Sequence, residues 1–191
     1  MEEPEFAELL SFVTKLVFSA KSTVAGGGST SSAVGVMWAD IRKTWSFQDI
    51  TEFFVHELGH SLMFLDELRY RHYVSLRDAV DPRSFAMSAI LETQRPLDKV
   101  LHSLVVATDV LLARERWLGH PANPKLHPPS PVMRAACLKT VDSILLNEAS
   151  IGQLSARGVE LVNLCRTKLD TVHPEIHMAE PRAQPSAGQP S

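Results

Sequence analysis

Hydrophobic residues recur at helical spacing through the middle of the chain. Over residues 50–63 they fall every three or four positions, and no Pro or Gly interrupts residues 61–77. Ser46 and Asp49 stand three residues apart ahead of this stretch, which is typical of an N-cap pair. The pattern therefore predicts a long helix that begins near Ser46 and ends near Ala79.

The same spacing predicts further helices, which leave little room for strands. They cover residues 6–17, 85–92, 96–118, 132–145 and 155–169. Residues 33–38 are apolar and rich in β-formers, so they predict a strand before the long helix. This strand is either a core strand or one that offers its edge to an extended peptide. Together the segments indicate a mainly α fold with a short β-strand element beside the long helix.

Two segments break the apolar pattern. The glycine- and serine-rich residues 26–32 are either a flexible linker or a structured turn that exposes backbone amides to a ligand. After Val172 the chain is rich in Pro, Ala, Gln, Ser and Gly, which is typical of disorder. We therefore expect one domain over residues 1–172 and a disordered tail over residues 173–191.

The composition bounds the partners that the chain can have. With 191 residues, 45% of them hydrophobic, the chain is long enough for one domain with a buried core. A net charge of −3 gives no reason to expect nucleic acid or an anionic membrane as a partner. No signal-peptide pattern and no bilayer-spanning apolar run is present, so we expect a cytoplasmic protein. Cys137 and Cys165 are expected to be buried free thiols.

Residues 56–60 read HELGH, a complete HExxH motif, inside the predicted long helix. His56 and His60 lie one turn apart on one helix face, where two imidazoles can bind one metal ion. Glu57 can reach a water molecule on that metal. The alternative is a surface helix that carries two histidines by chance, but the apolar flanks favour a metal site. Gly59 weakens a helix, which indicates close approach of another backbone or a ligand.

The usual third ligands of zinc peptidases are missing. The metzincin pattern requires Gly where this chain has Met63 and His where it has Asp66. Glu92 is the one candidate for the downstream Glu of a thermolysin-like site, and its neighbours do not fit that pattern. Asp66 and Glu67 lie too close to the motif on the same helix to complete the site easily.

His102 is the strongest remaining ligand candidate. It lies in an apolar predicted helix and shares one face of it with Arg95, Asp98 and Asp109. A polar strip on an otherwise apolar helix is a candidate wall of a binding site. The alternatives are a core histidine with satisfied hydrogen bonds and a buried salt bridge between Arg95 and Asp98.

Five segments carry a resemblance to a known enzyme family. They are residues 26–32 (GGGSTSS), 34–38 (VGVMW), 54–60 (FVHELGH), 64–67 (FLDE) and 95–103 (RPLDKVLHS). Together they resemble the 2-oxoglutarate-dependent, HExxH-type peptide β-hydroxylases, which modify ribosomally synthesised peptides. HExxH combined with the downstream RPLD and LH is more specific than HExxH alone, and the resemblance covers roughly residues 26–118.

The resemblance implies a non-haem iron enzyme. His56, His60 and His102 would hold Fe(II), in place of the two histidines and one carboxylate that are usual in iron oxygenases. The other positions on the metal would take 2-oxoglutarate and dioxygen, for hydroxylation at a side-chain Cβ of a precursor peptide. Zinc can occupy the site in purified protein, because it outcompetes iron for imidazoles.

The distal carboxylate of 2-oxoglutarate needs a cationic partner, and Arg95 is the best candidate. On a helix, seven residues separate Arg95 from His102 by ~10 Å at a rise of ~1.5 Å per residue. This separation suits a five-carbon diacid that reaches away from the metal. Ser103 and Lys99 are further candidates for the same anchor.

Three carboxylates, Asp66, Glu67 and Asp98, are expected to orient the ligand histidines. Glu57 would order a metal-bound water or the substrate. In the alternative, a zinc metallopeptidase, Glu57 would be the general base. A third hypothesis is a non-enzymatic peptide-binding module with a structural metal, for which His72 is the candidate fourth ligand.

The remaining histidines fall outside the predicted site. Unless it binds a structural metal, His72 is expected to be an exposed helix residue. His120, His127, His173 and His177 lie in the predicted loop 119–131 or in the tail. No role in the site is expected for these four.

Overall fold

The computed structural model describes residues 3–23 and 26–174 of the chain. Of these residues 61% are helical and 10% lie in strands, which confirms the prediction of a mainly α fold. The helices are α1 (Glu3–Val13), α2 (Phe47–Arg69), α3 (Leu76–Ala79), α4 (Leu97–Ala113), α5 (Ser130–Leu145), α6 (Glu148–Gln153) and α7 (Ala156–Leu169). The strands are β1 (Leu16–Ser19), β2 (Gly27–Ser29), β3 (Val36–Ala39), β4 (Ala86–Met87) and β5 (Gln94–Arg95).

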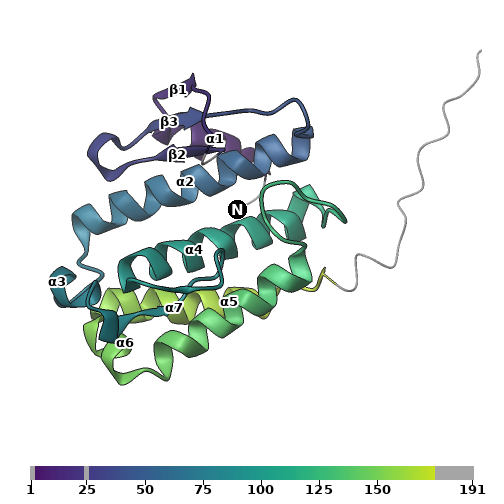
Figure 1. Ribbon diagram of the computed structural model, residues 1–191. Helices are drawn as coiled ribbons and strands as arrows, with labels where there is room; N and C mark the ends of the chain where they lie inside the picture. The colour runs from purple at the N-terminus through teal and green to yellow at the C-terminus, as the bar shows by residue number, and fades with distance from the viewer. Residues whose placement is uncertain (1–2, 24–25, 175–191) are drawn as a thin grey trace, which may run out of the picture.

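The long helices form stacked layers (Figure 1). Helix α4 lies between α2 on one side and the pair α5 and α7 on the other, and a three-stranded sheet covers the outer side of α2. Among the described residues, no helix is long and apolar enough to cross a bilayer. The expected disordered tail falls largely on residues 175–191, which lie outside the described part of the chain, as does His177.

Three of the long helices begin close to the residues at which the sequence predicts their starts. Ser46 and Asp49 form a capping box at α2, in which the Asp49 N–H donates to the Ser46 hydroxyl at 3.1 Å. Pro96 directly precedes the first turn of α4. The Ser155 hydroxyl accepts from the Gly158 N–H at 3.1 Å at the start of α7. The predicted helices over the second half of the chain are therefore found close to their expected bounds, and α6 is an additional short one.

The predicted end of α2 near Ala79 is wrong. The helix stops at Arg69, and Tyr70 takes an extended conformation. This turn lets the chain bury His72, whose carbonyl accepts a hydrogen bond from the Ser155 N–H at 3.0 Å. Contacts with the start of α7 therefore end a helix that its own sequence pattern would continue.

The sheet has the strand order β1-β3-β2. The predicted strand over residues 33–38 is confirmed only in its second half, because Ser31–Ala33 form a 3-10 helix and β3 begins at Val36. Strand β3 runs parallel to β1 and antiparallel to β2. Because both sides of β3 are paired, it offers no free edge. Residues 26–32 form β2 and a 3-10 turn, so this segment is a structured element and not a linker. The first predicted helix is too long, since α1 ends at Val13 and residues 16–19 form β1.

The predicted helix over residues 85–92 is also wrong. Strands β4 and β5 form a small hairpin there, and the Ser88 N–H donates to the Thr93 carbonyl at 2.9 Å. Glu92, in the turn, has a positive φ of 50°. A short apolar run does not distinguish a helix from a strand by its periodicity, which explains the error.

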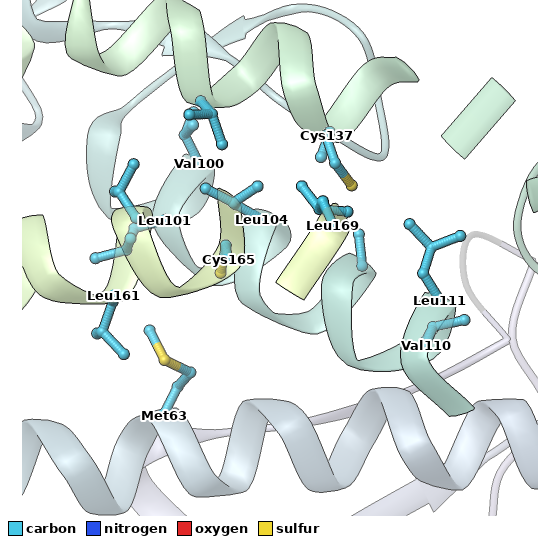
Figure 2. Packing of buried hydrophobic residues seen from close by; sticks show 14 of the residues in the cluster. Met63, Val100, Leu101, Leu104, Val110, Leu111, Cys137, Leu161, Cys165 and Leu169 are labelled. Atoms are coloured by element: carbon cyan, nitrogen blue, oxygen red, sulfur yellow. The ribbon is translucent and has the colours of Figure 1, made fainter. Parts of the chain in front are cut away.

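The buried core centres on α4. Leu101 and Leu104 of this helix pack toward Leu161 of α7 and toward α5 (Figure 2). Cys137 and Cys165 belong to the same cluster and are free thiols, as expected. Burial raises the pKa of each thiol to about 12, so both remain protonated.

At Gly59 helix α2 approaches α4 closely. A Cβ at this position would lie 3.2 Å from Val106 Cγ2 and 3.6 Å from Val106 Cα. The expected close approach of another backbone is therefore found, and the partner is α4. This contact brings the HExxH motif next to the helix that carries His102.

Two glycine substitutions test the contact between His72 and α7. An added Cβ at Gly158 would collide with the His72 carbonyl oxygen, whereas a Cβ at Gly152 would meet nothing within 4 Å. We expect Gly158→Ala to lower the free energy of unfolding by about 2 kcal/mol. Gly152→Ala should raise it by up to about 1 kcal/mol, because Ala is the better helix former. Urea unfolding of both variants checks this, and equal effects would contradict the packing described.

Candidate metal centre

One cavity of about 920 Å³ brings together all seven residues that the sequence assigns to the site. Helix α2 contributes three, β5 one and α4 three. They are His56, Glu57, His60, Arg95, Lys99, His102 and Ser103. Strand β2 and the segment that follows α2 complete the wall. Residues more than thirty positions apart in sequence therefore share one cavity.

His60 and His102 face each other with their Nδ1 atoms 3.4 Å apart. This distance is long for a hydrogen bond, but two imidazole nitrogens on one tetrahedral metal at about 2.0–2.1 Å would also lie about 3.4 Å apart. The other nitrogen of His102, Nε2, lies 3.2 Å from Glu67 Oε1. Because an ionised carboxylate only accepts hydrogen bonds, Nε2 carries the proton and Nδ1 keeps the lone pair that a metal requires.

His56 stands at the end of a buried polar chain. Arg114 donates to both carboxylate oxygens of Glu52 at 2.7 Å, and His127 Nδ1 lies 2.7 Å from Glu52 Oε1. With a neutral His127, this Nδ1 is the donor, so its Nε2 accepts from His56 Nδ1 at 2.9 Å. His56 therefore keeps its lone pair on Nε2, which is the nitrogen available to a metal.

The histidines of the cavity are residues of the type that binds metals, but they are not arranged as a complete metal site. Among residues 3–23 and 26–174, no group of three or more His, Cys, Asp or Glu side chains is arranged to hold a metal ion. His60 and His102 present two nitrogens at the spacing of co-ligands, but His56 directs its Nδ1 to His127. A site with three imidazoles therefore requires Nε2 of His56 to complete it.

Burial keeps two of these imidazoles neutral. It lowers the pKa of His56 well below its usual value, and the neighbouring His127 and His60 act in the same direction. Burial, with smaller contributions from His102 and Lys99, lowers the pKa of His60 to about 4. Neutral imidazole is the form that binds metals, so neither ring has to lose a proton at neutral pH.

Glu57 is the most conspicuous unsatisfied group in the cavity. Its side chain is buried, and Oε2 has no hydrogen-bond partner among the described residues. Burial raises the pKa of this carboxyl to about 7, although the nearby Ser29 hydroxyl offsets part of the effect without the alignment of a hydrogen bond. A buried carboxyl without a partner is costly, which indicates a group that serves a ligand.

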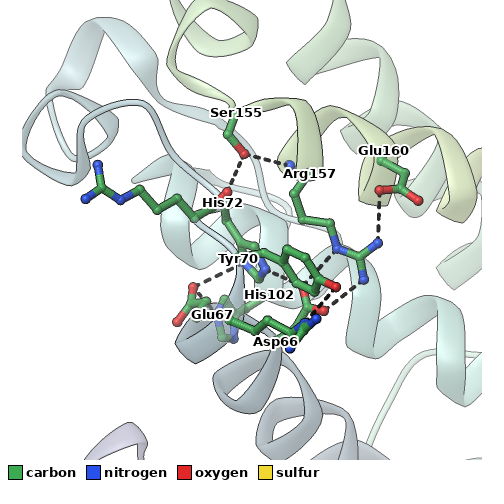
Figure 3. A network of polar contacts seen from close by, with 11 residues as sticks. Asp66, Glu67, Tyr70, His72, His102, Ser155, Arg157 and Glu160 are labelled. Carbon is green, nitrogen blue, oxygen red and sulfur yellow. Dashed lines mark hydrogen bonds and ion pairs between the residues drawn. The ribbon is translucent and has the colours of Figure 1, made fainter.

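A second polar network, at the C-terminal end of α2, contacts His102 of α4 (Figure 3). Arg157 of α7 donates to both oxygens of Asp66 at 3.0 and 2.8 Å, and His72 Nε2 lies 2.7 Å from Asp66 Oδ2. His72 Nδ1 is 3.4 Å from Glu67 Oε1, the same oxygen that contacts His102. Burial opposes the charge of Glu67, but His102 and His72 outweigh it and lower the pKa of Glu67 to about 2.

This network corrects the predictions for His72. It is not an exposed helix residue, because only 2% of it is exposed. Nor is it placed as a fourth metal ligand, since its two nitrogens face Asp66 and Glu67. Burial disfavours the protonated ring, but the two carboxylates outweigh burial and raise the pKa of His72. The three expected orienting carboxylates thus differ in role: Glu67 contacts His102, Asp66 contacts His72, and Asp98 pairs with Lys99 at 3.2 Å.

Arg95 lines the cavity from a different element than expected. It belongs to β5, before the first turn of α4, so it does not share a helix face with His102. No ion pair joins it to Asp98 in the part of the chain described, which removes the proposed salt bridge as an explanation. Asp109 does not line the cavity and instead lies 3.6 Å from Lys168 Nζ. The polar strip therefore ends at His102.

Ser103 has its hydrogen bonds satisfied inside the protein. Its hydroxyl donates to the Val100 carbonyl at 3.0 Å and lies 3.3 Å from the Ser88 hydroxyl, which comes from the β4–β5 hairpin. Ser103 thus ties the hairpin that carries Arg95 to α4. Glu92, the thermolysin-like candidate, lies exposed in the hairpin turn and does not line the cavity.

The residues that hold His56 in place were not predicted from the sequence. The expectation that loop histidines have no role is wrong for His127, which is buried and contacts His56. His120 instead lies 3.0 Å from Glu115. One signal was present in the sequence: Glu52 precedes His56 by one helical turn and shares its face.

The comparisons with known proteins add no identification. No family model matches the chain, and a search of curated proteins finds no match. The geometry of the cavity is therefore what supports a functional proposal.

His127 gives a direct test of how His56 is held. His127→Leu removes the acceptor for His56 Nδ1 and should weaken zinc binding about 10–100-fold. His127→Gln should restore part of the affinity, because its amide can donate to Glu52 and accept from His56. Competition with a chromophoric chelator measures both.

His120→Leu is the matched control. This residue comes from the same loop but contacts Glu115 instead of His56, so zinc affinity should not change. Unchanged affinity in His127→Leu as well would show that His56 does not depend on this relay.

Proposed function

We propose that the protein is an Fe(II)- and 2-oxoglutarate-dependent oxygenase that hydroxylates a side-chain Cβ of a ribosomally synthesised peptide. The observation that carries the proposal is the cavity itself. It gathers three imidazoles, of which His102 is buried, two cationic side chains and an unsatisfied carboxyl from segments that the sequence resemblance picked out independently.

The three histidines would hold the iron. His56 and His60 are neutral through burial, and Glu67 fixes His102 with its Nδ1 lone pair directed at His60. When bound, ferrous iron with 2-oxoglutarate and dioxygen supplies the oxidising power for hydroxylation, with succinate and carbon dioxide as the other products. The two relays keep the rings of His56 and His102 in one tautomer each, so the protein preorganises the ligands before the metal arrives.

The cationic residues would bind the distal carboxylate of 2-oxoglutarate. Arg95 lines the cavity and is half-buried, and a guanidinium fork matches a carboxylate with two parallel hydrogen bonds. Lys99 is already paired with Asp98, and Ser103 donates inside the protein. Arg95 is therefore the principal anchor, and the other two are secondary.

Zinc-dependent peptide hydrolysis is the second candidate, and Glu57 is the observation that favours it. Its carboxyl, with a pKa of about 7 and an oxygen without a partner, has the properties of a general base for a metal-bound water. In the hydroxylase, the same oxygen would instead position the substrate or a water molecule. The two candidates differ in whether 2-oxoglutarate binds.

Anaerobic titration of 2-oxoglutarate into the iron-reconstituted protein tests the proposal. We expect a saturable visible metal-to-ligand charge-transfer band, absent in His102→Ala. Arg95→Ala should raise the dissociation constant of 2-oxoglutarate about tenfold or more, because a charge-assisted hydrogen bond is lost.

Arg83→Ala is the control for loss of a surface arginine. Arg83 is exposed, pairs with Asp81 at 2.9 Å and does not line the cavity, so the titration should be unchanged. No band in wild-type protein that holds one iron per chain would refute the hydroxylase. Cleavage of a quenched fluorescent peptide library by the zinc form, abolished in Glu57→Gln, would then identify the peptidase.

A further inference from the structure

Strand β2 has one unpaired edge, and the register identifies which residues face it. The Asp40 N–H donates to the Gly26 carbonyl at 2.8 Å, so this pair is hydrogen-bonded across β3 and β2. Hydrogen-bonded and non-hydrogen-bonded pairs alternate in an antiparallel ladder. Gly28, opposite Trp38, is therefore also bonded to β3, whereas Gly27 and Ser29 direct their N–H and C=O groups away from it.

A contact on the other side of β3 supports this assignment. Ala39, opposite Gly27, accepts a hydrogen bond from the Ala20 N–H at 3.0 Å, on the side of β1. The backbone carbonyl of Ala39 therefore points away from β2. In the described part of the chain, β2 has no strand partner other than β3. The backbone groups of Gly27 and Ser29 form the free edge of the sheet.

This free edge borders the metal-site cavity. Gly27, Gly28 and Ser29 line it together with His56 and Glu57. The two glycines have no side chains to cover the edge, and the structure leaves no room for any. A Cβ at Gly27 would collide with the Phe53 ring, and one at Gly28 would lie 2.7 Å from Trp38 Nε1.

Two buried polar atoms beside the edge also lack partners. Glu57 Oε2 and Ser29 Oγ have no hydrogen-bond partner among the described residues, and only 4% of Glu57 is exposed. A small diacid at the metal cannot satisfy a row of strand amides and carbonyls. A ligand with its own alternating N–H and C=O groups can satisfy both the edge and these side chains.

We propose that an extended segment of the peptide substrate pairs with Gly27 and Ser29 and adds a fourth strand to the sheet beside β2. The outward residues of β2 are two positions, or about 7 Å, apart, so every second peptide residue would form main-chain hydrogen bonds. The peptide would then pass Glu57 and His56 with its alternate side chains directed to the two faces of the strand. The inference rests on the proposed function for the identity of the peptide as substrate.

Nuclear magnetic resonance of the zinc-loaded, full-length protein tests the inference with an internal control. The ligands are peptides selected against this protein from a random twelve-residue library displayed on messenger RNA. We expect peptide binding to slow hydrogen exchange of the Gly27 and Ser29 amides at least tenfold. The Gly28 amide, already bonded to β3, should change little.

Methylation of the peptide backbone supplies the second readout. N-methyl groups placed one residue at a time should weaken binding more than tenfold at alternate positions and have little effect between them. Tolerance at every position, or peptide binding with unchanged Gly27 and Ser29 amides, would overturn the inference. Protection of β1 amides instead, or a selection that yields no peptide, would also overturn it.

These experiments can refute the peptide site and the proposed function independently of each other. Strand-type protection without a charge-transfer band would retain the peptide site and refute the hydroxylase. A band with 2-oxoglutarate, together with peptides that leave Gly27 and Ser29 unprotected, would retain the hydroxylase and refute pairing at β2.

Discussion

The close approach of α2 and α4 at Gly59 is the constraint on which the rest of the site depends. Any side chain at this position would press on Val106, whose Cγ2 lies 3.2 Å from where a Cβ would be. Because the helices meet there, His60 on one helix and His102 on the other come within 3.4 Å. A larger separation would move His102 out of reach of a metal held by the HExxH motif.

Two carboxylates, the buried Glu52 and the partly exposed Glu67, then give the imidazoles their orientation. Glu52 acts on His56 through His127, and Glu67 acts on His102 directly. A buried carboxylate that loses its partner costs about 3–5 kcal/mol, and Arg114 removes this cost for Glu52. The second relay ends, through Asp66 and His72, in the partly exposed Arg157 (Figure 3). Stability of the fold and alignment of the ligands therefore depend on the same contacts.

The helix with HExxH, strand β3, the helix of His102 and the seven lining residues could be predicted, because local periodicity and motif spacing determine them. The end of α2, the β4–β5 hairpin and the burial of His72 could not. Each depends on a contact with a distant segment, as when the Ser155 N–H binds the His72 carbonyl. His127 was missed for the same reason, since a histidine in a proline-rich loop carries no sign of its partner. Arg95 lines the cavity as predicted. It was expected on the helix of His102, however, and lies in β5 instead.

The central claim is that His56, His60 and His102 together bind one metal ion. X-ray absorption spectroscopy of the iron-loaded protein tests it most directly, because multiple scattering from imidazole rings counts the histidine ligands. We expect three imidazoles in the wild-type protein and two in His102→Ala. Two imidazoles and a carboxylate in the wild-type protein, with no change in His102→Ala, would contradict it.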